Sequence, residues 1–118
     1  MSERGDIEYL KDILEAIKRI QTFTRNMGQE DLLDDLKTQD AVLRNLEIIG
    51  EAVKNISSDV RSEYPDIEWR KISGMRDKII HMYFGVNWDI VWDVIENELP
   101  KLKKEVQNCL KELEKEKN

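Results

Sequence analysis

The stretch VLRNLEIIGEAVKNI, residues 42–56, decides the fold class of this chain. Its apolar residues follow one another at steps of 4, 3, 4 and 3, namely Val42, Leu46, Ile49, Val53 and Ile56. This is the spacing of a helix that buries one face along a seam. The polar residues on the other side are interpreted as a solvated face: Arg44, Glu47, Glu51 and Lys54. The helix is expected to begin near Leu32 or Thr38 and to end at Ile56.

Three more helical segments follow from the same pattern on either side of this stretch. The first covers residues 6–25, and Asn26-Met27-Gly28 is its stop signal. Another begins near Asp66 or Glu68 and ends at Gly85, after a loop that has room for a short helical turn. The last starts behind Asn87, a good N-cap. Its apolar residues are separated alternately by four and three positions throughout residues 88–113. Pro100 lies inside this segment, so a kink or brief break is expected there.

These patterns predict an all-α protein, a four- to five-helix up-and-down bundle, as a single domain over residues 1–118. The single cysteine, Cys109, excludes an internal disulfide, and no His/Cys cluster exists to hold structural zinc. The protein is therefore expected to be intracellular and cytoplasmic. The first residues mix acids and bases unlike a signal peptide, and no stretch approaches the roughly 20 apolar residues that span a bilayer. No membrane partner is expected.

The charge pattern excludes one class of nucleic-acid binder. The chain carries a net charge of −6, whereas a protein that coats nucleic acid needs clustered Lys and Arg. The charge is divided unevenly, because residues 70–86 hold four bases and one acid, a net of +3, which leaves −9 for the rest. The pattern favours one small phosphate site on an acidic scaffold.

The segment whose residue types could take part in a reaction is WRKISGMRDKIIHMYFG, residues 69–85. On a helical wheel the apolar stripe consists of Ile72, Met75, Ile79, Met82 and Tyr83. The opposite face carries Gly74, Asp77, Lys78 and His81, and Arg76 lies at the edge of the stripe. Asp77 and His81 are four residues apart, so the carboxylate can reach the imidazole and fix its orientation.

Two interpretations of this segment are open from residue types and spacing alone. A lone histidine on a polar helix face is usually solvated, and an arginine beside a carboxylate is usually a surface ion pair. Arg76 and His81 also differ by about 140° around an ideal helix. They can act together only if the helix distorts, if the arginine reaches round, or if a second subunit supplies its own copy.

The segment 76–83 is similar to a family motif in which an arginine, four residues, a histidine, one residue and a tyrosine follow one another. This motif is typical of the HEPN superfamily, and specifically of HepT-like toxins. Residues 38–52, 67–70, 82–85, 89–92 and 98–100 also resemble the family, so the likeness covers roughly residues 6–113. One departure is Met82, where the family commonly has a glycine before the tyrosine.

The resemblance implies a specific function. HepT-like proteins are four- to five-helix bundles that dimerise with the motif in a cleft near the interface, and they act as metal-independent endoribonucleases without a cofactor. By this resemblance Arg76 and His81 are the catalytic pair, and Asp77 and Lys78 support them. The family forms the toxin half of a type VII-like toxin–antitoxin pair, whose MntA-like nucleotidyltransferase transfers AMP onto the tyrosine that corresponds to Tyr83. RNA is the expected substrate, and DNA is not expected.

The chemistry suits these residue types. Histidine can take a proton from a 2′-hydroxyl or give one to a leaving 5′-oxygen, and a guanidinium stabilises the charge of the phosphorane-like transition state. With one histidine per chain, a separate base and acid require His81 from two subunits, so activity is expected to depend on homodimerisation.

The alternative is a non-catalytic partner that binds nucleotide or substrate for a nucleotidyltransferase. Trp69, Trp88 and Trp92 could stack on bases, although Trp88 and Trp92 fit better as core or interface anchors.

Overall fold

The computed structural model describes residues 4–81 and 85–117, and at residues 76, 79, 80, 81 and 117 it describes the backbone only. Every regular element among these residues is helical and none is a strand, which confirms the predicted fold class. The long helices are α1 (Asp6–Phe23), α3 (Leu36–Lys54), α5 (Trp69–His81) and α7 (Leu99–Lys117). The short elements are α2 (Gln29–Leu33), α4 (Ser58–Glu63), α6 (Trp88–Asp93) and the π-helical turn η1 (Val94–Glu98).

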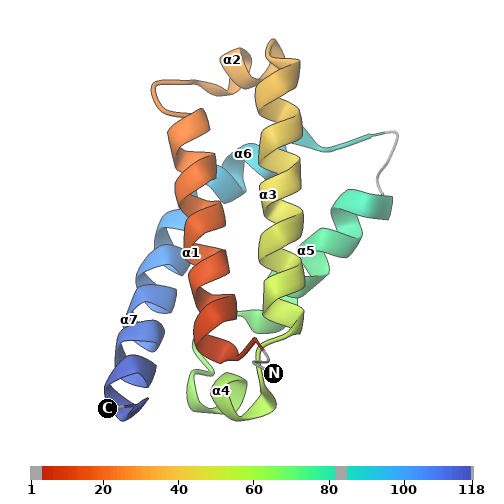
Figure 1. The fold of residues 1–118 in the computed structure, drawn as a ribbon. Helices are drawn as coiled ribbons and strands as arrows, with labels where there is room; N and C mark the ends of the chain where they lie inside the picture. The colour runs from red at the N-terminus through yellow and green to blue at the C-terminus, as the bar shows by residue number, and fades with distance from the viewer. Residues whose placement is uncertain (1–3, 82–84, 118) are drawn as a thin grey trace.

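Successive long helices run in opposite directions, as predicted for an up-and-down bundle (Figure 1). α1 and α3 lie side by side, α7 packs against α1, and α5 packs against α3. The short helix α2 lies at one end of the α1–α3 pair, and α4 lies at the opposite end (Figure 1). The segment with the basic residues is therefore a helix on the flank of the bundle.

Side-chain caps explain where the helices begin. Asp35 accepts a hydrogen bond from the backbone nitrogen of Thr38 at 3.0 Å, which starts α3 and separates it from α2. Of the two predicted starts, Leu32 and Thr38, the observed start at Leu36 is nearer the second, and Leu32 belongs to the separate helix α2. Asn87 Oδ1 accepts from the backbone nitrogens of the second and third residues of α6 at 3.1 and 3.2 Å, which confirms the predicted N-cap. α1 ends at Phe23 rather than residue 25, and Asn26 has a φ of 65° where the chain turns.

The distortion predicted near Pro100 is a π-helical turn. The turn η1 ends directly before Leu99 and Pro100. A proline has no backbone N–H, and its ring crowds the carbonyl group four residues earlier, so the regular α-helical bond to Glu96 is lost. The apolar residues of this region nevertheless remain buried on one side: Ile95, Leu99, Leu102, Val106 and Cys109. The helix changes its local geometry without turning its apolar face from the core, as predicted.

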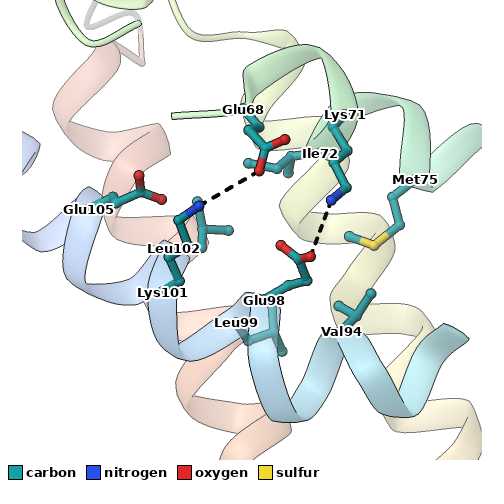
Figure 2. Close-up of a pocket in the computed structure, with 10 residues that line it drawn as sticks. All are labelled: Glu68, Lys71, Ile72, Met75, Val94, Glu98, Leu99, Lys101, Leu102 and Glu105. Carbon is teal, nitrogen blue, oxygen red and sulfur yellow. Dashed lines mark hydrogen bonds and ion pairs between the residues drawn. The ribbon is translucent and has the colours of Figure 1, made fainter. Parts of the chain in front are cut away.

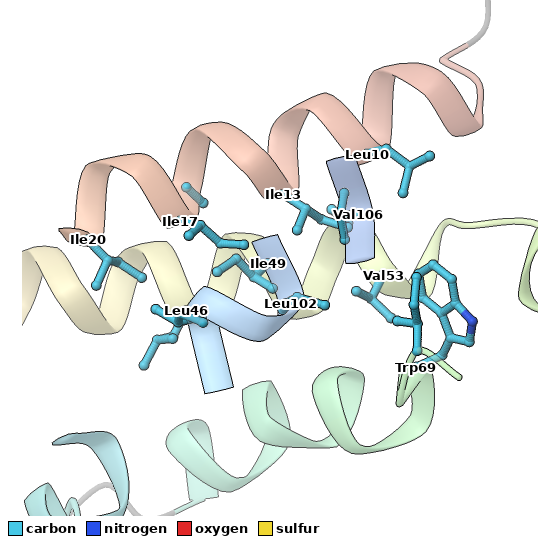
Figure 3. Close-up of a cluster of buried hydrophobic side chains, with 14 of the residues drawn as sticks. Leu10, Ile13, Ile17, Ile20, Leu46, Ile49, Val53, Trp69, Leu102 and Val106 are labelled. Atoms are coloured by element: carbon cyan, nitrogen blue, oxygen red, sulfur yellow. The ribbon is translucent and has the colours of Figure 1, made fainter. Parts of the chain in front are cut away.

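The core fills the seam between α1, α3 and α7 (Figure 3). All five apolar residues predicted for this helix face are buried, although α3 ends at Lys54 rather than at Ile56, so Ile56 is buried from the segment that follows the helix. Facing them are Leu10, Ile13, Ile17 and Ile20 of α1 and Leu102 and Val106 of α7. Burial raises the pKa of the Cys109 thiol to about 12 because an apolar interior disfavours the thiolate. Among the described helices, none combines the length and the apolar character needed to cross a bilayer.

Candidate active site on helix α5

Helix α5 is anchored to the bundle at its N-terminal end. Trp69 is 6% exposed, and its Nε1 donates a hydrogen bond to the carbonyl oxygen of Tyr64 at 3.0 Å. One turn further, Ile72 and Met75 are half-buried against the core. Figure 1 shows the helix leaving α3 toward its C-terminal end. These contacts join the first half of α5, residues 69–75, to the core.

Burial of the tryptophans corrects one expectation. Trp69 is enclosed by the fold, so its ring is not available to stack on a base, as the sequence had allowed. Its place at the start of a helix, with the indole N–H bonded to the preceding loop, makes it an anchor. Trp88 and Trp92 are half-buried and pack against the core, in agreement with the preferred interpretation.

The predicted catalytic pair lies on α5, with Arg76 and His81 about 7.5 Å apart along the helix axis. The side-chain geometry of this pair falls outside the described part of the structure, and so does the expected contact between Asp77 and His81. Tyr83 also lies outside the described residues, whereas Gly85 is described and is not helical. The roles of Arg76, His81 and Tyr83 therefore remain predictions.

The carboxylate of Asp77 has a partner that the sequence did not reveal. Lys54 Nζ, at the end of α3, donates a hydrogen bond to Asp77 Oδ1 at 3.1 Å. The sequence had placed Lys54 on a solvated helix face, and both side chains are indeed exposed, at 39% and 52%. The two residues are 23 positions apart, so only the packing of α5 on α3 brings them together.

Lys78 is exposed, and its side chain borders a shallow apolar pocket between α5 and α6. The pocket includes Leu46 of α3, Met75 of α5 and Ile90 of α6, which is 55% exposed. A lysine stem covers apolar surface well while its ammonium group stays in water. The supporting role of Lys78 stays a prediction.

A second depression separates α5 from η1 and α7, and two ion pairs bridge it (Figure 2). Lys71 Nζ lies 3.2 Å from Glu98 Oε1, and Lys101 Nζ lies 3.9 Å from Glu68 Oε1. The hydrogen bond to Glu98 raises the pKa of Lys71. The enclosed volume is about 50 Å³, which suits one or two waters and not a nucleotide.

A polar groove between α1 and α3 is larger, at about 240 Å³. Its ionisable lining residues are Asp12, Arg44, Glu47 and Glu51 and the phenol of Tyr9. Glu47 is paired with Arg44 at 3.6 Å. With three carboxylates and one guanidinium, this groove is a poor place for a phosphate. Glu51 is exposed and Glu47 partly so, which agrees with their interpretation as a solvated face.

Comparison with known proteins identifies the family. The model of the ribonuclease HepT-like family matches residues 13–109, which run from α1 to α7 and include all of α5. The chain belongs to the HepT-like ribonuclease family. The HepT-like match agrees with the resemblance seen in the motif and in its flanking segments. Among the described residues, no group of three or more His, Cys, Asp or Glu side chains is placed to hold a metal ion.

Relatives of this HepT-like chain come from archaea and bacteria. A Thermococcus cleftensis protein named "Probable ribonuclease HepT" is 50% identical over 101 residues, covering 86% of this chain and 92% of the relative. A Methanocaldococcus jannaschii protein, also named as an RNase, is 46% identical over 108 residues, covering 92% and 89%. A third relative named as an RNase, from Caldanaerobacter subterraneus subsp. tengcongensis, is 42% identical over 102 residues, covering 86% and 91%. No solved structure gives a significant match.

Proposed function

We propose that this protein is a metal-independent endoribonuclease whose catalytic pair is Arg76 and His81. The observation that carries the proposal is the family match over residues 13–109, which includes the whole of α5. Relatives named as ribonucleases align with 86% or more of the chain. The net charge of +3 over residues 70–86 supports a phosphate ligand at this helix, since the rest of the chain is acidic.

The proposed reaction is a transesterification within RNA. A base removes the proton of the 2′-hydroxyl, the 2′-oxygen forms a bond to the adjacent phosphorus, and the bond from phosphorus to the 5′-oxygen breaks. An acid protonates that 5′-oxygen. The products are a 2′,3′-cyclic phosphate and a 5′-hydroxyl end. His81 serves proton transfer, and Arg76 stabilises the charge on the phosphorane-like transition state, for which its planar fork of donors is well suited.

A homodimer follows from the histidine count. One histidine per chain supplies one proton-transfer group, whereas the reaction uses a base and an acid at once. A two-fold axis that brings two copies of α5 together would supply both groups from His81 and would double the local positive charge. Asp77 and Lys78 would support this cleft by orienting His81 and by contacting phosphate.

The proposed setting is a type VII-like toxin–antitoxin pair. In it, an MntA-like nucleotidyltransferase joins the hydroxyl of Tyr83 to the α-phosphate of ATP, and pyrophosphate leaves. The AMP group would place a phosphate beside Arg76 and so occupy the place of the scissile phosphate. This would silence the ribonuclease without unfolding it.

End-group analysis of a cleaved RNA tests the ribonuclease proposal. The purified protein is incubated with a labelled single-stranded RNA in excess EDTA, and a matched RNA carries 2′-O-methyl groups throughout. We expect cleavage of the first RNA to 2′,3′-cyclic phosphate and 5′-hydroxyl ends, and none of the second. Cleavage that stops in EDTA contradicts metal independence. Nucleotide binding without any cleavage of RNA supports the non-catalytic alternative instead.

Mass spectrometry tests the modification. The protein is co-expressed with an MntA-like nucleotidyltransferase, and the wild type is compared with Tyr83→Phe. We expect AMP adducts on the wild type only. Adducts that persist in Tyr83→Phe would refute the assigned acceptor, and a wild type without adducts would refute the AMP-transfer mechanism.

A further inference from the structure

We propose that Lys54 is a positioning residue of the ribonuclease, because its ion pair with Asp77 holds the motif-bearing half of α5 against α3. This inference rests on the proposed function, since it assigns Lys54 a part in the reaction carried by Arg76 and His81. It does not place Lys54 in contact with the RNA. The supporting observations come from α3, α4 and α5.

The end of α3 does not need Lys54 as a cap. Arg61, from α4, donates from Nη2 to the carbonyl oxygen of Val53 at 2.6 Å and from Nε to that of Ile56 at 3.1 Å. A lysine in the last turn of a helix commonly bonds to those terminal carbonyl groups itself. Arg61 binds the carbonyl oxygen of Val53 in this last turn, whereas the ammonium group of Lys54 meets Asp77 Oδ1 of α5 at 3.1 Å.

The pair acts on the half of α5 that carries the motif. The anchors at the other half are the buried Trp69 and the ion pair from Lys71 to Glu98. Asp77 lies six residues, about 1.7 helical turns, beyond Lys71 on α5. The Lys54 contact therefore limits rotation and outward movement where the motif begins.

Asp77 links this contact to the catalytic residues. It directly follows Arg76 and stands four positions before His81 on the same helix. A carboxylate accepts several hydrogen bonds on its two oxygens, so the bond from Lys54 to Oδ1 leaves capacity for another donor. Fixing one oxygen fixes the direction of the other. Small displacements of catalytic groups cost large factors in rate, which makes a modest surface contact relevant to activity.

Kinetics of four variants test the proposal. Lys54→Met removes the ammonium group and keeps most of the stem, Lys54→Arg keeps the pair, and Asp77→Asn removes the acceptor charge. Lys11→Met is the matched control, since Lys11 is an exposed lysine, 58% accessible, paired with Glu114 of α7 at 4.0 Å. We expect kcat to fall about 10-fold in Lys54→Met with little change in KM. Lys54→Arg and Lys11→Met should remain near wild type.

A double variant separates positioning from direct RNA binding. The double variant carries both Lys54→Met and Asp77→Asn. If Lys54 acts through Asp77, the fold-decrease in kcat of the double variant equals the larger of the two single decreases and not their product. If Lys54 instead contacts a phosphate, KM rises, its salt dependence weakens, and the two losses multiply. The second result would overturn the proposal.

The single histidine gives a readout that needs no activity. Only His81 contributes imidazole signals to a long-range ¹H–¹⁵N spectrum of the chain. We expect these signals to shift in Lys54→Met and to stay unchanged in Lys11→Met. Unchanged signals and unchanged kcat in Lys54→Met would overturn the role of Lys54 alone. A wild type that cleaves no RNA would overturn the proposed function, and the spectra would then show whether the Lys54–Asp77 pair still orients His81.

Discussion

The seam between α1 and α3 and the helix α5 are held in different ways. The seam consists of side chains that are fully buried, such as Ile13, Ile17 and Ile49. Among the described side chains of α5, by contrast, the buried Trp69 and the half-buried Ile72 and Met75 are supplemented by exposed ion pairs to both neighbouring sides. Apolar burial dominates the stability of the fold, whereas exposed ion pairs contribute little to it. Their main effect here is to restrict the orientation of α5. The fold thus separates the part that makes it stable from the part that presents polar side chains.

The largest expected difference between the two regions is in the free energy of unfolding that is lost when one apolar side chain in each is truncated. Ile49→Ala removes atoms from a fully buried site and should lower the free energy of unfolding by about 2–5 kcal/mol. Met75→Ala in α5 should cost about 1–2 kcal/mol, because its side chain is half-buried. Urea unfolding followed by circular dichroism measures both. Equal losses at the two sites would show that α5 is as much a part of the core as α3.

A smaller effect is expected at the anchor of α5. Trp69→Phe keeps an aromatic ring but removes the hydrogen bond from Nε1 to the carbonyl oxygen of Tyr64. The net loss of such a bond is about 1 kcal/mol. We expect a small decrease in the unfolding midpoint together with faster amide exchange that is confined to α5. Exchange that quickens equally in α1 and α3 would contradict the view that Trp69 anchors α5 alone.

The smallest effect concerns the proposed homodimer. Two models of its active site predict activities that differ by a factor of two. Wild-type chains are mixed with an equal amount of His81→Ala chains under conditions in which subunits exchange. If each active site needs both histidines, the activity per total protein falls to about a quarter of the wild-type value, since only a quarter of the dimers hold two wild-type chains. If each histidine works alone, activity falls to about half. An obligate monomer with full activity would remove the dimer from the mechanism.

The same comparison explains how much of the fold was predictable from the sequence. The α3 face from Val42 to Ile56 and the apolar phase across Pro100 were correct because a repeat within one helix needs no knowledge of its neighbours. The start of this helix was left open between Leu32 and Thr38 and α2 was not predicted, although Asp35 three positions before Thr38 is an N-cap signal. The burial of Trp69 was missed because it depends on the path of the loop before α5.

The candidate site was predictable to a smaller extent. The motif placed Arg76 and His81 on one helix, and the structure agrees. The expected neighbour of Asp77 was His81, four residues on, since spacing along a helix reveals only partners on that helix. Lys54 comes from another helix, 23 residues away, and is exposed, so no pattern in the sequence distinguishes it from an ordinary surface lysine. Contacts between helices require the packing itself.

The central claim is that α5 carries the chemistry while the seam carries the stability, and His81→Ala tests it most directly. The rate of RNA cleavage and the urea midpoint are measured on the same preparations of wild type and variant. We expect cleavage to fall by about 100-fold or more, because proton transfer is lost, while the midpoint stays at the wild-type value. Cleavage that survives the substitution, or a loss of activity that comes with a lower midpoint, would contradict the account.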